Sequence, residues 1–175
     1  EIQRNLPRQL EAARLIKQID PSITIAISAA SSIQLPPHPY ITVPQKYTYE
    51  LMRAARSAIA TSGTVTLELA LHETPTIVTY ELSRFNHFIA NHLLRLNMSA
   101  YCIVNILCNC IVFPEFITFK YTSEELLEWF LLLHKEGSER ELCLNACRKL
   151  KQILGGNQGS ARAAEIIKNV ISHAG

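Results

Sequence analysis

The chain of 175 residues is 48% hydrophobic and 18% charged, with a formal net charge of +2. Its length and apolar content suit one compact domain and exclude an intrinsically disordered chain. The small charge is scattered along the sequence, which argues against a nucleic-acid-binding protein. No stretch approaches the ~20 apolar residues of a membrane-spanning helix, and the opening residues carry no signal peptide, so we expect a cytoplasmic protein.

Helical and strand patterns alternate through the first 105 residues. Residues 6–18 have amphipathic helical spacing and precede a buried strand at 23–27. The other expected elements are strands at 41–43, 57–60, 76–80 and 101–104, helices at 49–56, 64–72 and 84–96, and a Pro-rich loop at 34–39. This alternation predicts an α/β fold, with a Rossmann-like parallel sheet flanked by helices and right-handed crossovers.

The final third reads as helices only. Thr122-Ser-Glu-Glu125 fits a capping box before an apolar helix at 126–134. Two further helices, at about 138–153 and 160–172, are separated by a Gly-rich turn. We therefore divide the chain into a Rossmann-like lobe at 1–121 and C-terminal helices at 122–175, which pack on that lobe or cross to a partner lobe.

The turn between the strand at 57–60 and the next helix predicts a ligand site. Ser62, Gly63 and Thr64 stand where the first turn of a helix has unpaired N–H groups and the positive end of its dipole, which can hold a phosphate. Ser-Gly-Thr alone also fits an ordinary helix cap. Glu68, one helical turn further on among apolar residues, favours a nucleotide site because its carboxylate could accept hydrogen bonds from ribose hydroxyls.

Other candidate sites are weaker. Glu81 and Asn105 are expected at the same carboxyl edge of the sheet as the Ser-Gly-Thr turn. His87 and His92 are five residues apart, so they do not converge on one metal ion. The Rossmann glycine fingerprint and the P-loop motif are both absent from the sequence. We expect neither a metal nor a cofactor.

Cysteines and one basic run have both ordinary and functional interpretations. The five cysteines, at 102, 108, 110, 143 and 147, are an odd number, which favours free thiols, and their spacing is unlike that of usual zinc sites. Arg148-Lys149-Lys151 fits a solvated helix face, with contact to anionic lipid headgroups as the alternative.

Several segments together resemble lipid-A-disaccharide synthase. They are residues 60–71 (Ala-Thr-Ser-Gly-Thr-Val-Thr-Leu-Glu-Leu-Ala-Leu), 74–80, 89–90, 105–107 and 112–116, together with the opening Glu-Ile-Gln-Arg-Asn-Leu-Pro. The resemblance covers nearly the whole chain and weakens after Thr122. It implies a GT-B glycosyltransferase, which has two Rossmann-like lobes with the active site between them. This chain would be the carboxyl-terminal, donor-binding lobe.

The resemblance also implies the reaction and its ligands. The family enzyme transfers 2,3-diacylglucosamine from UDP to 2,3-diacylglucosamine 1-phosphate (lipid X), forming a β-1,6 disaccharide and releasing UDP at the inner face of the cytoplasmic membrane. UDP-2,3-diacylglucosamine and lipid X would be the ligands and an anionic membrane surface a partner, with a homodimer left open. The catalytic base would lie in the amino-terminal lobe, so we expect no catalytic residue in this chain and no transfer by it alone.

Site residues follow from the same resemblance. Ser62, Gly63 and Thr64 would contact the UDP diphosphate, and Glu68 would hold the ribose. Asn105 would line the donor site.

This sequence departs from the family pattern at several positions near the expected site, one of which is Val104, where relatives usually have proline. Relatives usually have basic residues at the positions of Glu81, Asn91 and His92, and Ala-Gly-Arg where this chain has Cys-Asn109-Cys110. Losing one charge-assisted hydrogen bond to a diphosphate costs about 1.5–3 kcal/mol.

Two alternatives therefore stay open. A non-catalytic remnant that serves as an interaction module is favoured by these departures. A UDP-sugar 2-epimerase shares the fold, but Thr64 and Leu67 favour the synthase.

Overall fold

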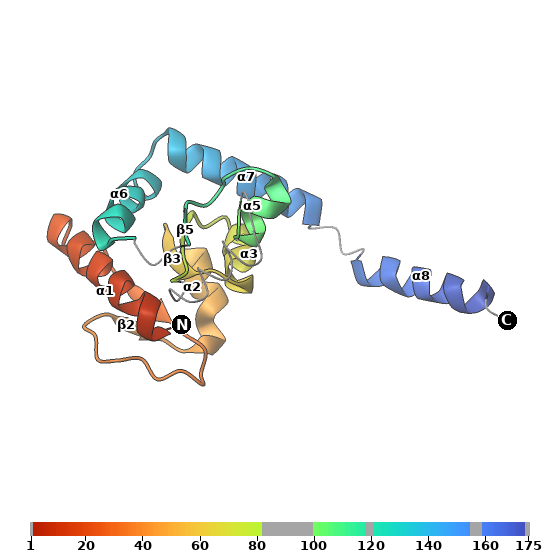
Figure 1. Cartoon of the computed structure of the whole chain (residues 1–175), viewed down its shortest axis with the longest axis horizontal. Helices are drawn as coiled ribbons and strands as arrows, with labels where there is room; N and C mark the ends of the chain where they lie inside the picture. Colours follow the sequence, from red (N-terminus) through yellow and green to blue (C-terminus); the bar gives the residue numbers. More distant parts are fainter. Residues whose placement is uncertain (1, 82–99, 118–120, 155–158, 174–175) are drawn as a thin grey trace, which may run out of the picture.

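A computed structural model describes residues 2–81, 100–117, 121–154 and 159–173 (Figure 1). The helix expected at 84–96 lies outside these ranges, and so do His87, Asn91 and His92. The described elements are α1 (Ile2–Ile19), β1 (Ala26–Ser28), β2 (Ile41–Val43), the 3-10 helix η1 (Gln45–Tyr47), α2 (Thr48–Ala54), β3 (Ala58–Thr61), α3 (Thr64–Leu71), β4 (Thr76–Thr79), α5 (Ile103–Cys108), β5 (Glu115–Phe116), α6 (Ser123–His134), α7 (Ser138–Leu154) and α8 (Gly159–His173).

All described strand pairs are parallel, which confirms the predicted α/β class with its Rossmann-like character. β1 pairs with β2, while β3, β4 and β5 form a second sheet with β4 in the middle. β4 is buried along its whole length, and Ile77 and Val78 are fully inaccessible. A strand covered on both faces is typical of a parallel sheet between layers of helices.

The hydrophobic core lies between the three-stranded sheet and the helices around it. α1 packs along α6, and α7 packs across α3 and α5 (Figure 1). The core side chains come from the sheet, from α1 and from the loop before β5, and α6 and α7 contribute the rest: Ala12, Ile16, Ile77, Val78, Phe113, Leu126, Leu133 and Leu150. The sheet therefore has a fixed position relative to α1 and α7.

The helix α6 begins as its sequence predicts. The Thr122 hydroxyl accepts a hydrogen bond from the Glu125 N–H at 3.2 Å, and the Glu125 carboxylate accepts one from the Thr122 N–H at 2.7 Å. These reciprocal bonds are the capping box that satisfies two backbone donors at a helix start.

The strand expected at 101–104 is wrong, because helix α5 begins there. The Glu115 carboxylate accepts hydrogen bonds from the N–H groups of Tyr101 and Cys102, both at 2.9 Å. α5 ends at Asn109, whose left-handed backbone (φ 51°) is a common helix terminus for asparagine. Contacts with a residue more than ten positions away therefore override the strand preference of the local apolar sequence.

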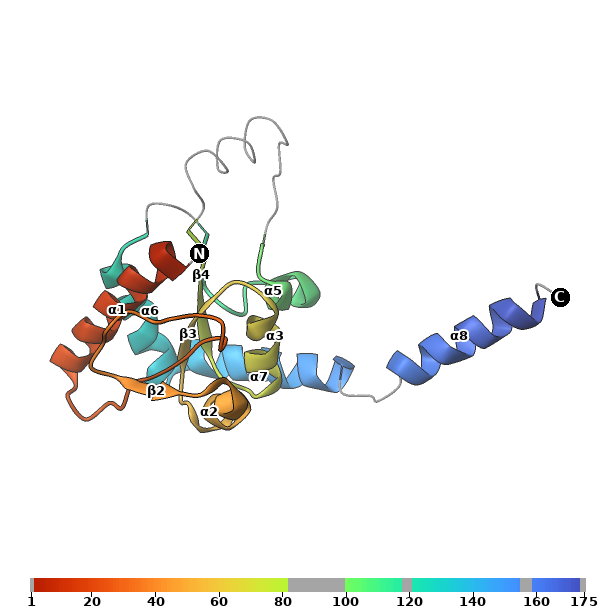
Figure 2. The same cartoon turned by 90° about the horizontal axis from the view of Figure 1, so that it is seen from below.

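α8 forms at the predicted place but extends away from the rest of the structure (Figures 1 and 2). Residues 163–171 are all exposed. Ile166, Ile167, Val170 and Ile171 are 59–69% exposed and have the spacing of one helix face. α6 contacts α1 and β4, and α7 contacts α3 and α5, while the division into a lobe and C-terminal helices, with a crossing to a second lobe, stays a prediction. None of the described helices is both long enough and apolar enough to span a bilayer.

Adjacent leucines on α6 test the position of the core. Leu133 is 2% exposed and Leu132 is 47% exposed. Leu133→Ala should lower the free energy of unfolding by about 2–5 kcal/mol, because it removes buried methyl groups and leaves a cavity. Leu132→Ala is the matched control and should cost about 1 kcal/mol or less. Urea unfolding followed by circular dichroism measures both, and equal losses would contradict the packing of α6.

Candidate functional site

The predicted Ser-Gly-Thr turn lies at the carboxyl edge of the three-stranded sheet. β3 pairs with β4 so that Thr61 is opposite Thr79, and the Ser62 N–H donates to the Thr79 carbonyl at 2.9 Å. α3 starts three residues after β3 ends. We call residues 61–64 the donor corner. Its position is the one where open α/β sheets bind ligands.

The helix α3 has an uncapped start. Gly63 is its N-cap residue, has an extended backbone, and no side-chain hydrogen bond caps the helix. The Thr66 hydroxyl donates to the Gly63 carbonyl at 2.7 Å and does not accept a hydrogen bond from the first-turn N–H groups of α3. A Cβ atom placed on Gly63 would meet nothing within 4 Å. First-turn N–H groups beside open space are the arrangement that binds an anion.

Glu68 lies on α3, one helical turn beyond the donor corner. Its side chain is half-buried. Among the residues that the structure describes, none forms a hydrogen bond or ion pair with its carboxylate. A partly desolvated carboxylate without a partner is unfavourable. Glu68 is therefore available to accept hydrogen bonds from ligand hydroxyls.

Asn105 has a different environment. It is 1% exposed, and its amide nitrogen donates to the Phe113 carbonyl at 2.7 Å and to the Glu115 carboxylate at 2.6 Å. Its oxygen accepts from the N–H groups of Val112 and Phe113 at 2.8 and 2.9 Å. Two donors and two acceptor sites are all that the amide has. Asn105 fixes the segment between α5 and β5, and its lining of the donor site stays a prediction.

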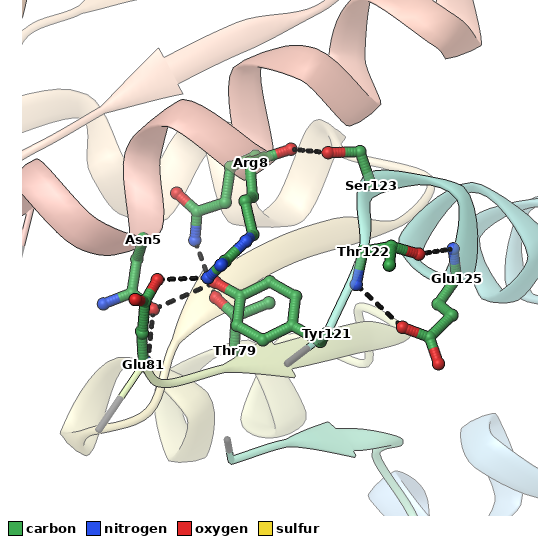
Figure 3. A network of polar contacts seen from close by, with 9 residues as sticks. Asn5, Arg8, Thr79, Glu81, Tyr121, Thr122, Ser123 and Glu125 are labelled. Atoms are coloured by element: carbon green, nitrogen blue, oxygen red, sulfur yellow. Dashed lines mark hydrogen bonds and ion pairs between the residues drawn. The ribbon is translucent and has the colours of Figure 1, made fainter. Parts of the chain in front are cut away.

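Three residues of α1 that sequence reasoning missed border this edge. Asn5, Arg8 and Gln9 contact the ends of β3 and β4, as Figure 3 shows for Asn5 and Arg8. Arg8 forms an ion pair with Glu81, 73 positions away. No local pattern links such distant positions, so a single sequence carries no signal that could have found them.

The departure at Asn109 has a structural explanation. The family resemblance implies glycine at this point, and Asn109 adopts the left-handed conformation (φ 51°, ψ 33°) that glycine adopts readily and asparagine tolerates. The shape of the turn after α5 is therefore compatible with both residues. Cys110 is exposed, and the resemblance implies a cation at its position.

The cysteines and the basic run have no arrangement that indicates a site. All five cysteines are free thiols, and Cys102, Cys143 and Cys147 are buried. Within the described ranges, no cluster of three or more His, Cys, Asp or Glu side chains could hold a metal ion. Arg148 and Lys151 both pair with Glu73, at 3.2 and 2.9 Å, so this cluster is partly neutralised.

An open hollow of about 380 Å³ lies away from the donor corner, in the loop between β1 and β2. Its lining mixes polar and apolar surface and comes from Ile33, Leu35, Pro36, Pro37, His38 and Thr42. No residue of the donor corner contributes to it.

Removing the Asn105 side chain tests its structural role. Asn105→Ala leaves buried N–H groups of Val112 and Phe113 without an acceptor, and each unsatisfied group costs about 1–3 kcal/mol. We expect a loss of about 3 kcal/mol or more in the free energy of unfolding. Asn109→Gly, four residues away, should change it by about 1 kcal/mol or less. A stable Asn105→Ala variant in chemical denaturation would refute the role.

Comparison with known proteins finds a family and relatives for this chain. The family model described as Lipid-A-disaccharide synthetase matches residues 1–171. Similar relatives are the lipid-A-disaccharide synthases of Chlamydia pneumoniae (37% identical over 73% of this chain and 21% of the relative), Chlamydia abortus (42%, over 66% and 19%) and Trichlorobacter lovleyi (29%, over 98% and 46%). No solved structure matches the chain.

The chain spans about a fifth of the length of the chlamydial relatives and under half of the Trichlorobacter relative. The family match nevertheless runs almost from end to end of this chain, and it includes the donor corner, Glu68 and Asn105. By this match the chain belongs to the lipid-A-disaccharide synthetase family.

Proposed function

We propose that this chain is the donor-binding lobe of a glycosyltransferase that makes the lipid A disaccharide. The donor would be UDP-2,3-diacylglucosamine and the acceptor lipid X, as the family resemblance implies. The observation that carries the proposal is the donor corner: among the described residues, the start of α3 is uncapped and lies beside open space, and the Glu68 carboxylate one turn along the same helix has no hydrogen-bond or ion-pair partner.

The chemistry of UDP fits the two parts of this site. The diphosphate would lie against the N–H groups at the start of α3, with Ser62, Gly63 and Thr64 around it. When the sugar–phosphate bond breaks, negative charge grows on the leaving UDP, and fixed N–H dipoles stabilise that charge without reorganising. Glu68 would accept hydrogen bonds from the ribose hydroxyls, which orients the nucleotide along α3.

Transfer would need a second lobe. A general base must take the proton from the acceptor hydroxyl, and the resemblance places that carboxylate in the amino-terminal lobe. The exposed apolar face of α8 supports the proposal that this helix crosses to such a lobe, because four large aliphatic side chains there have no cover of their own. Since both substrates carry acyl chains, transfer would take place at the inner face of the cytoplasmic membrane.

The structure weakens the case for a non-catalytic remnant. Glu81 has an ion-pair partner in Arg8, and Asn109 fits the backbone of the turn. Two of the departures from the family pattern are therefore accommodated by the fold. An epimerase of the same fold is disfavoured by Thr64 and Leu67, which match the synthase pattern.

Calorimetric titration with UDP tests the nucleotide site. The unaltered chain should release measurable heat, and Glu68→Ala should bind UDP at least tenfold more weakly, which is about 1.4 kcal/mol, because the ribose hydroxyls lose their acceptor. Glu128→Ala, an exposed carboxylate on α6, is the control and should bind as the unaltered chain does. No heat at millimolar UDP would support the remnant instead.

Substitution of Gly63 tests the diphosphate position separately. Gly63→Val should abolish UDP binding, because the added methyl groups occupy the space that the phosphates would enter, while the melting temperature stays unchanged. Gly137→Val is a matched control, since a Cβ there also meets nothing within 4 Å. A Gly63→Val variant that still binds UDP would remove the donor corner from the site.

A further inference from the structure

One face of α1 lies against the donor edge of the sheet. Asn5, Arg8 and Gln9 are spaced three and four residues apart, so their side chains leave the same side of the helix. Figure 3 shows Asn5 and Arg8 directed toward the end of β4 and toward Tyr121, which precedes α6. These contacts bring together three segments that are far apart in the sequence.

Neutral hydrogen bonds join this face to both strands. The Gln9 amide donates to the Thr79 hydroxyl at 2.9 Å and to the Thr61 hydroxyl at 3.5 Å. The Asn5 oxygen accepts from the Glu81 N–H at 2.8 Å and from the Tyr121 hydroxyl at 3.2 Å. Burial raises the pKa of Tyr121, which keeps this hydroxyl protonated and able to donate.

An ion pair completes the contact. The Arg8 guanidinium meets the Glu81 carboxylate, and the two side chains are 32% and 19% exposed. Arg8 also lies over the Tyr121 ring, 4.8 Å from its centre. A partly buried pair is screened less by salt than a surface pair, and removing one partner leaves the other charge poorly solvated.

Thr79 links the α1 contacts to the donor corner, because it forms hydrogen bonds with both Gln9 and Ser62. Its hydroxyl accepts the Gln9 bond, and its carbonyl accepts the Ser62 N–H at 2.9 Å. Glu81 follows two residues later, about 7 Å along an extended chain. A displacement of α1 relative to the end of β4 would therefore move Ser62 and the turn that it begins.

We propose that Arg8 and Glu81 are a positioning pair for the donor corner. Their ion pair holds the end of β4 against α1, and so fixes the turn at Ser62–Thr64 in the geometry that receives a diphosphate. Neither side chain needs to touch the ligand. The proposal rests on the proposed function for its ligand, UDP, and adds two residues to the site that the motif does not contain.

A charge exchange tests the pair. Arg8→Glu and Glu81→Arg each place like charges together, and each should weaken UDP binding at least tenfold in calorimetry. The double variant with both changes restores opposite charges and should bind within about threefold of the unaltered chain. Glu11→Arg, on the same helix in an exposed pair with Arg14, makes the same change of charge and should leave UDP affinity unchanged.

A milder variant covers the case in which the single reversals do not fold. Glu81→Gln keeps the shape of the side chain and removes its charge, and it should weaken UDP binding severalfold without loss of helical circular dichroism. Unchanged UDP affinity in Glu81→Gln would overturn the positioning pair. A double variant whose loss of UDP affinity equals the summed losses of the two single variants would overturn it too. Either result would leave the proposed function standing. Failure of the unaltered chain to bind UDP would overturn the proposed function, and the pair's role in it.

Discussion

The hydrogen bond from the Ser62 N–H to the Thr79 carbonyl, at 2.9 Å, decides where the donor corner lies. It continues the β3–β4 register by one residue, so the chain leaves the sheet at its carboxyl edge and enters α3 without a capping side chain. The core behind the sheet keeps β4 fully buried between helices, which holds this edge in place. The proposed anion site therefore depends on strand pairing first and on the identity of Ser62 and Thr64 second.

The starts of α3, α5 and α6 have different surroundings. The Glu115 carboxylate accepts hydrogen bonds from the N–H groups of Tyr101 and Cys102, just before α5, and a capping box closes the start of α6. In the part of the chain that the structure describes, the start of α3 has glycine at its cap, open space beside it, and no side chain bonded to its N–H groups. Because a carboxylate already lies beside the start of α5 and α6 has its capping box, the contrast favours α3 over these two helices as the phosphate site.

Local sequence patterns were enough to predict α1, α6, α7 and the turn at the donor corner. Helical periodicity, a capping box and a glycine between strand and helix are all encoded by residues within a few positions of one another. The local pattern predicted a strand where α5 begins, because the start of α5 depends on Glu115. It also gave no sign that the Asn105 side-chain amide forms all of its hydrogen bonds with Val112, Phe113 and Glu115. The Arg8–Glu81 pair was equally hidden, since tertiary packing alone brings together residues 73 positions apart. Glu81, which looks like a lost cation in the sequence, is one half of an ion pair in the structure.

The most direct measurement is the amide nitrogen–proton NMR spectrum of the chain during addition of UDP. If the diphosphate lies at the start of α3, the signals of Gly63, Thr64 and Val65 should move most, because their N–H groups would become donors to phosphate oxygens. Saturable shifts confined to the hollow at residues 33–42, with the signals of Gly63, Thr64 and Val65 unmoved, would place the nucleotide elsewhere and contradict the assignment of the donor corner.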